Sequence, residues 1–192
     1  MLENTNLINA QKQIIFTDGS AASICKNKKD KHARGGYSVL FVDGPIKNKV
    51  LLGNLDTTIS FASNIRAEGM AIIASLETCS DLIEQTEIEI YTDSEFWIKM
   101  ISTYMPTWEK KKIDFNVKKN PDLTTYLWKI WKAINLQHKI KLVHVYAHNK
   151  SGWKTSKNKF EKMCYDNNEL ADKFAEEARK DLKIGQQVWR DL

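Results

Sequence analysis

The stretch that decides the fold is residues 14–20, IIFTDGS, where an apolar run ends at Thr17 and Asp18. An unbroken apolar run is typical of a strand that is buried on both faces. Residues 88–94, IEIYTDS, have a similar form, because apolar residues again lead to a threonine and then to Asp93. If both strands lie near the centre of one sheet, the two carboxylates can face each other. A buried carboxylate is costly unless a cation compensates it, so the pair indicates a cation site.

The surrounding sequence predicts an α/β fold. Strands are expected at residues 13–19, 37–42, 50–54, 87–92 and 140–146, and helices at residues 63–79, 94–101, 122–137 and 168–182. Ser63 is the expected N-cap of the first helix. The first three strands follow one another across turns, which is typical of an antiparallel meander. The later strands alternate with helices, which implies parallel pairing, so the sheet is expected to be mixed with helices packed against it.

Length and composition favour one folded domain. The chain has 192 residues, 42% of them hydrophobic, with only 8 Gly and 3 Pro. These values exclude a disordered or collagen-like protein, and the length suffices for a core without a disulfide or metal staple. We expect a short N-terminal arm at residues 1–11, a single folded domain at 12–182 and a C-terminal tail at 183–192.

The sequence also carries expectations about location. No apolar run approaches the 18 or so residues of a membrane-spanning helix, and the N-terminus lacks a secretory signal. Cys25, Cys79 and Cys164 are widely spaced and odd in number, which suits a reducing compartment. We therefore expect an intracellular protein, cytoplasmic or nuclear, with no membrane partner.

Positive charge is gathered in three segments. Lysine plus arginine total 29 against 24 acids, for a formal net charge of +5. Lysines crowd residues 26–34, 110–119 and 150–162. Basic clusters of this kind favour a polyanionic partner such as nucleic acid, although any one cluster alone is equally well explained as a solvated loop.

Two further acids complete a candidate site. Glu68 lies in NIRAE, residues 64–68, and Asp172 lies in NELAD, residues 168–172. Each acid has an ordinary alternative explanation: a turn for Asp18, a helix N-cap for Asp93, dipole compensation for Glu68 and a solvated helix position for Asp172. Spacing alone does not establish that the four converge. If they do, hard oxygen ligands select Mg²⁺ or Mn²⁺, and two ions roughly 3.5–4 Å apart suit phosphodiester hydrolysis.

Four strings, in this order, resemble the signature of the ribonuclease H type 1 family: FTDGS at residues 16–20, NIRAE at 64–68, YTDS at 91–94 and NELAD at 168–172. Residues 35–37, GGY, resemble the start of the family's second strand. Trp108 with the three lysines that follow at 110–112 resembles its basic protrusion, and residues 145–148, VYAH, resemble the strand before its mobile histidine loop. The resemblance covers roughly residues 12–180, although the lysine-rich loop at 20–35 and the segment from 148 to 172 are longer than expected.

The resemblance implies an α/β ribonuclease H-like fold, a mixed five-stranded sheet with helices on both faces. It implies an endonuclease that hydrolyses the RNA strand of an RNA–DNA hybrid duplex with two Mg²⁺ or Mn²⁺ ions, largely regardless of sequence, and leaves 5′-phosphate and 3′-hydroxyl ends. Asp18, Glu68, Asp93 and Asp172 would be the catalytic metal ligands, and His148 would assist proton transfer or product release. We expect a monomer without a small-molecule organic cofactor.

The resemblance also implies contacts with nucleic acid. The expected residues are Gly19, Ser20, Asn64, Arg66, Ser94, Trp108, Lys110, Lys111 and Lys112. Asn64 would donate to the backbone or to a 2′-hydroxyl, which is the group that distinguishes RNA from DNA. The three lysines would meet phosphates of the DNA strand, while Trp108 would support the protrusion or stack on a sugar.

Two other functions remain open at this stage. One is a DNA nuclease or junction resolvase of the same fold, since such enzymes share the architecture and the acidic clustering. The other is a catalytically weak nucleic-acid-binding module. Cleavage of different nucleic-acid structures would separate the two enzymes, and a metal titration would separate either enzyme from the binding module.

Overall fold

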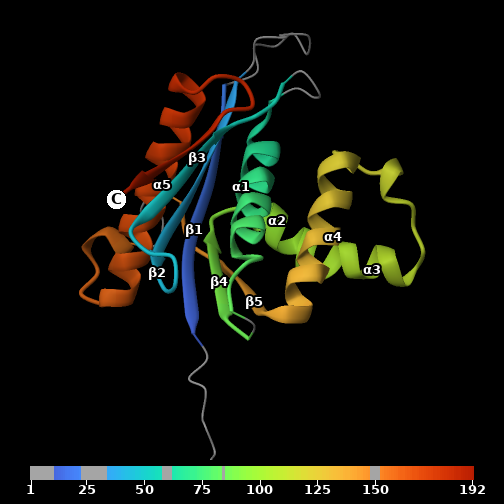
Figure 1. The fold of residues 1–192 in the computed structure, drawn as a ribbon, viewed down its shortest axis with the longest axis horizontal. Coiled ribbons are helices and arrows are strands. Elements are labelled where there is room, and N and C mark those ends of the chain that lie inside the picture. The colour runs from blue at the N-terminus through green and yellow to red at the C-terminus, as the bar shows by residue number, and fades with distance from the viewer. Residues whose placement is uncertain (1–10, 23–33, 58–61, 84, 148–151) are drawn as a thin grey trace, which may run out of the picture.

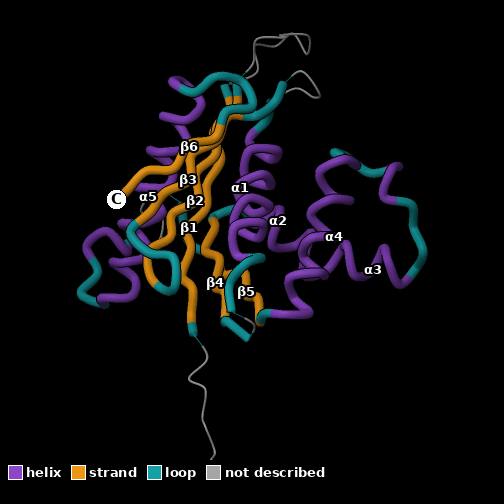
Figure 2. Tube along the Cα trace, viewed as in Figure 1, coloured by secondary structure: helices purple, strands orange, loops and turns teal. Residues whose placement is uncertain are grey.

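The computed structural model of the chain describes residues 11–22, 34–57, 62–83, 85–147 and 152–192. Within these residues it contains one sheet with the strand order β5-β4-β1-β2-β3-β6 (Figure 2). The strands are β1 (Lys12–Ala21), β2 (Gly35–Asp43), β3 (Lys49–Asn54), β4 (Glu87–Thr92), β5 (Lys139–His144) and β6 (Gln187–Asp191).

Five α-helices accompany the sheet in the described part of the chain. They are α1 (Asn64–Cys79), α2 (Glu95–Lys99), α3 (Met105–Lys110), α4 (Pro121–Gln137) and α5 (Lys159–Asp181). A π-helical turn at Met100–Tyr104 joins α2 directly to α3. The predicted N-cap of α1 is confirmed, because the Ser63 hydroxyl accepts a hydrogen bond from the backbone NH of Arg66 at 3.2 Å.

The strand β1 lies at the centre of the sheet and changes its direction of pairing. It runs antiparallel to β2, where Asp18 faces Ser38, and parallel to β4, where Phe16 faces Tyr91. The strands β4 and β5 are also parallel, so the predicted mixed sheet is confirmed. Ile15 and Phe16 are both fully buried and belong to clusters on opposite faces, which explains the continuous apolar run.

The helices α1 and α5 cover opposite faces of the sheet (Figure 1). Glycines let both helices come close to the strands. A Cβ added at Gly19 of β1 would lie 2.1 Å from the backbone nitrogen of Glu68 in α1, and one added at Gly36 of β2 would lie 2.2 Å from that of Arg179 in α5. The helices also present fully buried alanines such as Ala67 and Ala171 to the sheet. Both helices are therefore held against the end of β1 that carries Asp18.

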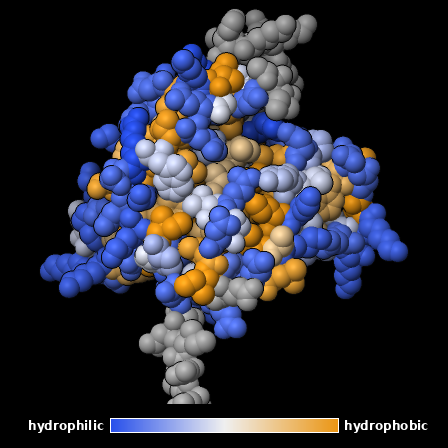
Figure 3. All heavy atoms as spheres, viewed as in Figure 1, coloured by the Kyte–Doolittle hydropathy of each residue, from blue (hydrophilic) through white to orange (hydrophobic). Residues whose placement is uncertain are grey.

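The helices α3 and α4 extend to one side of the sheet and form a protrusion (Figure 1). The protrusion is attached where α4 packs against α1. There Arg66 of α1 donates to both carboxylate oxygens of Asp122 in the first turn of α4, at 3.0 and 2.5 Å. Hydrophilic residues dominate the face seen in Figure 3, including the far end of the protrusion.

The structure differs from the sequence-based expectation in α3, which no expected helix covered, and at two further places. The sheet has a sixth strand, β6, formed by residues of the expected C-terminal tail that pair antiparallel with β3. The helix α5 begins at Lys159 rather than near Asn168, because the Asn158 side chain caps it by accepting from the NH groups of Phe160 and Glu161. No helix in the described ranges combines the length and apolar character needed to cross a membrane.

Candidate active site

Asp18 lies on β1, and Asp93 comes directly after Thr92, the last residue of the neighbouring strand β4. The parallel ladder between β1 and β4 pairs Phe16 with Tyr91, and each aspartate follows two residues later. The two carboxyl groups are close enough for the charge of Asp93 to raise the pKa of Asp18. Asp18 is only 6% exposed, and its Oδ1 accepts from the backbone NH of Gly19 at 2.7 Å.

Glu68 and Asp172 approach Asp18 from the two helices. Glu68 follows Ala67 in α1, at the point where Gly19 allows the closest approach of helix and strand. Asp172 follows Ala171 in α5, whose carbonyl accepts from the Ser38 hydroxyl at 2.7 Å, and Ser38 is the strand partner of Asp18. Two strands and two helices thus carry the four predicted acids to one end of β1.

The pKa of Asp18 shows that the four acids influence one another. Burial raises it well above its ordinary value of 3.8, and the charge of Asp93 raises it further. The hydrogen bond from Gly19 opposes this, while the charges of Asp172 and Glu68 add to the increase. A carboxylate in these surroundings needs a compensating cation to stay ionised without cost.

Glu68 has a partner of its own. The Ser94 hydroxyl donates to its Oε2 at 2.5 Å. Burial raises the pKa of Glu68 from 4.5 to about 7; the hydrogen bond from Ser94 lowers it and the charge of Asp93 raises it.

The donor set fits divalent ions of the Mg²⁺ class, because it consists of carboxylate oxygens that repel one another. Nevertheless, no three His, Cys, Asp or Glu side chains in the described part of the chain are arranged as ligands of one ion. The mutual repulsion of the acids is compatible with the absence of a ready ligand set. Carboxylates repel each other over distances longer than a bond between metal and ligand. The acids are gathered, but their side chains do not form a closed ligand set.

The raised pKa of Glu68 predicts how stability depends on pH. Between about pH 5 and pH 8 the folded state holds a proton that the unfolded state releases, so the free energy of unfolding falls as pH rises. The fall attributable to Glu68 is about 3 kcal/mol at most. Urea unfolding in EDTA at both pH values measures it. The Glu68→Gln variant should lose this part of the dependence, and an unchanged dependence in the variant would contradict the assignment.

Three of the expected nucleic-acid residues, Asn64, Ser20 and Gly19, lie near the acids. Asn64 is exposed, and its Oδ1 accepts from the backbone NH of Ala21 at 2.8 Å, so the side-chain NH₂ group can still donate. Ser20 accepts from Arg179 Nε at 3.2 Å, and Gly19 lies against the backbone of α1. The expected His148 lies outside the described residues.

Arg66 and Ser94 use their side chains within the protein. Both are at least nine-tenths buried. The guanidinium of Arg66 is bound by Asp122, so this residue joins α1 to α4. The Ser94 hydroxyl is used between Glu68 and the backbone NH of Trp97. This geometry gives no support to direct nucleic-acid contacts by the two side chains.

The protrusion presents the expected lysines to solvent. Lys110, Lys111 and Lys112 are exposed at the end of α3 and just beyond it. Trp108 packs between Tyr104 and Phe115, with ring centroids 6.2 and 5.4 Å away, and Lys118 Nζ lies 5.0 Å from its ring centroid. Trp108 therefore supports the protrusion.

Sequence reasoning missed a residue that positions the site. Trp97 is fully buried, and its indole Nε1 donates to the carbonyl of Ile65 at 2.7 Å, which fixes α2 against α1. The available signal was the order Asp93-Ser94, followed by Trp97 three residues after the cap. A serine N-cap before a large apolar residue predicts a short helix anchored by that residue, but its partner on α1 is not visible in the sequence.

Comparisons with known proteins identify related sequences and similar folds. The ribonuclease H family pattern matches residues 10–180. The ribonuclease H of Campylobacter jejuni (strain 81-176) is 36% identical over 135 residues, which cover 70% of this chain and 78% of that protein. The crystal structure of LC9-RNase H1, a type 1 RNase H with the type 2 active-site motif, is similar in fold, with a TM-score of 0.62 and 14% identity over 95% of this chain and 78% of that chain.

LC11-RNase H1, solved in complex with an RNA/DNA hybrid, is similar in fold, with a TM-score of 0.52 and 19% identity over 87% of this chain and 96% of that chain. At such identities the solved structures establish the fold, whereas the family pattern and the Campylobacter relative establish descent. The chain belongs to the ribonuclease H family, and its activity is hydrolysis of the RNA strand of RNA–DNA hybrids.

Proposed function

We propose that Asp18, Glu68, Asp93 and Asp172 together hold two Mg²⁺ or Mn²⁺ ions during hydrolysis. The family depends on divalent metal ions in general. The observation that carries the proposal for this chain is the environment of Asp18, a buried carboxyl whose pKa is raised by burial and by the three other acids. When bound, such ions activate the attacking water and stabilise the leaving oxygen.

Two of the acids have individual roles that follow from their positions. Asp18 is the most deeply buried of the four and is influenced by all the others, which suits a ligand shared between ions. Asp93 directly follows the neighbouring strand and acts on the pKa of both Asp18 and Glu68, which suits the acid nearest the attacking water. His148 is proposed to assist proton transfer or product release. Attack by water then leaves 5′-phosphate and 3′-hydroxyl ends.

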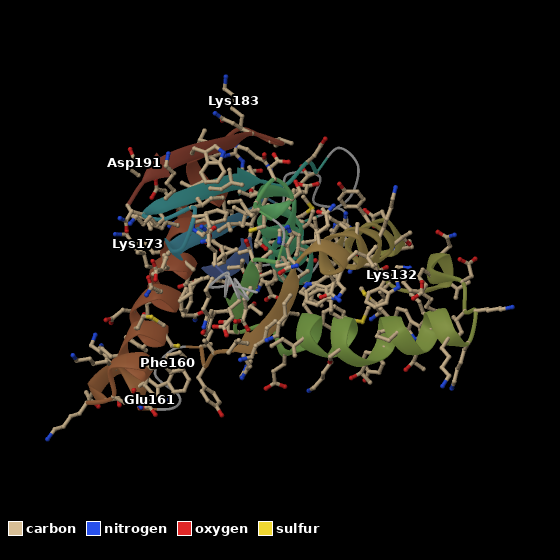
Figure 4. The ribbon with its side chains drawn as sticks, turned by 60° about the horizontal axis from the view of Figure 1, so that its bottom comes forward. Lys132, Phe160, Glu161, Lys173, Lys183 and Asp191 are labelled. Atoms are coloured by element: carbon tan, nitrogen blue, oxygen red, sulfur yellow. The ribbon has the colours of Figure 1, made fainter. Side chains whose placement is uncertain are left out.

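The partner proposed for this surface is the RNA–DNA hybrid duplex. Figure 4 shows the protrusion, where Lys132 is labelled, and the start of α5, where Phe160 and Glu161 are labelled, on opposite sides of the view. The exposed lysines at residues 110–112 would bind phosphates, and Asn64 would donate to the backbone or to a 2′-hydroxyl. Phosphate contacts position a substrate without reading its sequence, so cleavage should be largely sequence-independent and sensitive to salt.

A panel of four substrates tests the proposed function. Labelled RNA–DNA hybrid, duplex DNA, duplex RNA and a four-way DNA junction are incubated with the chain in Mg²⁺, in Mn²⁺ and in EDTA. We expect cuts only in the RNA strand of the hybrid, only with a divalent ion, and with 5′-phosphate products. Cleavage of junctions or duplex DNA instead would favour a DNA nuclease, and tight hybrid binding without cleavage would favour a binding module.

A further inference from the structure

The hydroxyl of Ser94 joins α1 to α2 at the catalytic end of the sheet. It donates to Glu68 Oε2 at 2.5 Å and accepts from the backbone NH of Trp97 at 3.4 Å. Ser94 is 5% exposed, so water competes little for either bond. The same oxygen therefore caps α2 and holds one of the two carboxylate oxygens of Glu68.

The turn that carries Ser94 is itself fixed. The backbone NH of Ser94 donates to the Thr92 hydroxyl oxygen at 3.2 Å, and the NH of Glu95 donates to the carbonyl of Asp93 at 3.0 Å. Because Thr92 ends β4, these bonds tie the serine hydroxyl to the end of that strand. The position of the hydroxyl relative to Asp93 is thereby set by the sheet.

A second contact fixes α2 against α1. Trp97 is fully buried and donates from Nε1 to the carbonyl of Ile65 at 2.7 Å. Gly69 makes room for its ring, because a Cβ added there would lie 2.5 Å from Trp97 Cζ2. With the tryptophan anchored in this way, Ser94 cannot move away from Glu68 without breaking the packing of both helices.

We propose that Ser94 is a positioning residue for Glu68. By holding Oε2, it restricts the rotation of the carboxylate and leaves Oε1 as the oxygen that can bind a divalent ion. Without this hydrogen bond, the last side-chain torsion angle of a glutamate has a broad distribution. An unrestrained carboxylate would therefore lose more rotational freedom when it binds an ion. The inference rests on the proposed function, in which Glu68 is a metal ligand, and goes beyond it by assigning Ser94 to ion affinity rather than to nucleic acid.

Binding of Mn²⁺ to the full chain without any nucleic acid tests the proposal. Isothermal titration calorimetry is performed on the wild type and on Ser94→Ala, Ser94→Gly and Ser94→Thr. Partners of metal ligands typically contribute about 10- to 100-fold in affinity, and we expect losses in this range for the alanine and glycine variants. Threonine keeps the hydroxyl and should restore most of the affinity. Glycine caps a helix almost as well as serine, so the glycine variant separates capping from the bond to Glu68.

A matched control is Ser80→Ala, which removes an exposed serine at the other end of α1 and should leave Mn²⁺ affinity unchanged. Wild-type affinity in both the alanine and glycine variants would overturn the proposal, as would a threonine variant that binds no better than the glycine variant. Steady-state cleavage adds a second measure: high Mn²⁺ should restore kcat in Ser94→Ala while the KM for hybrid stays unchanged.

The calorimetry keeps this inference distinct from the proposed function. If Ser94 variants lose Mn²⁺ affinity as expected but the wild type cuts no hybrid, the proposed reaction fails and the positioning role stands. If the wild type cuts hybrid and Ser94→Ala binds Mn²⁺ normally, the positioning role fails and the reaction stands.

Discussion

Replacing Asp93 with asparagine should abolish most hydrolysis while leaving the fold and hybrid binding in place. The substitution removes one charge at nearly constant shape, at a residue that acts on the pKa of both Asp18 and Glu68. Loss of about 4 kcal/mol of transition-state stabilisation corresponds to about a thousandfold lower rate, and we expect at least this reduction. Single-turnover cleavage of a labelled hybrid in Mg²⁺ measures the rate, and fluorescence anisotropy in Ca²⁺ measures binding.

Asp166→Asn is the matched control for this experiment. Asp166 is exposed on α5 and pairs with Lys162 at the surface, so the same chemical change there should leave the cleavage rate close to that of the wild type. An Asp93→Asn variant that cuts as fast as the wild type would remove Asp93 from the catalytic site. A variant that loses hybrid binding as strongly as cleavage would show that Asp93 acts on substrate affinity instead.

Adding a side chain at Gly19 should damage both stability and activity. A Cβ at this position would lie 2.1 Å from the backbone nitrogen of Glu68 and 2.3 Å from the carbonyl carbon of Ala67. Backbone atoms cannot move aside as a flexible side chain would, so α1 must shift away from β1. Overpacking commonly costs about 1–3 kcal/mol, and we expect Gly19→Ala to lie at or above the upper end. Urea unfolding measures the loss.

The shift should also lower the rate of hydrolysis, because Glu68 moves away from Asp18 together with α1. Gly185→Ala provides the comparison. Its Cβ would meet Asp56 Cβ at 3.8 Å, an ordinary contact, and only the positive φ of 72° opposes the substitution. We expect this substitution to lower the free energy of unfolding by about 1–2 kcal/mol and to leave the rate of cleavage unchanged. Wild-type stability and rate in Gly19→Ala would contradict the close contact between β1 and α1.

The strands that lead to the aspartates were predictable from local pattern, a continuous apolar run in β1 and isoleucines alternating with charged residues in β4. The run ending at Thr17 predicted β1, and the expected strand at 87–92 has the same bounds as β4. The order of strands and helices then predicted parallel pairing in the second half, which β4 and β5 confirm. In these segments local pattern and tertiary environment agree, so the sequence alone was sufficient.

Two elements could not be recognised from hydrophobic periodicity. The strand β6 has five residues and is stabilised by pairing with β3, which sequence pattern does not reveal. The early start of α5 was signalled by Asn158 and by Glu161 three residues later, a typical N-terminal pair, but the polar residues that follow hid the apolar face. Tertiary pairing decides β6, whereas a local side-chain cap decides where α5 begins.

The candidate site was predictable as a set of residues but not as a geometry. The strings around the four acids identified them through resemblance, whereas their spacing in the sequence left each one with an ordinary explanation. Their convergence depends on Gly19 and Gly36, which allow the two helices to approach the sheet. The internal use of Arg66 and Ser94 depends on partners in α4 and α1 that no local pattern reveals.

The most direct test of the account is a crystal structure of the chain with Mn²⁺ and an uncleaved RNA–DNA hybrid, with ion positions taken from anomalous scattering. We predict two ions about 3.5–4 Å apart, bound by carboxylate oxygens of Asp18, Glu68, Asp93 and Asp172, with the scissile RNA phosphate against them. Ions bound elsewhere, or a hybrid whose RNA strand passes far from Asp18, would contradict the account.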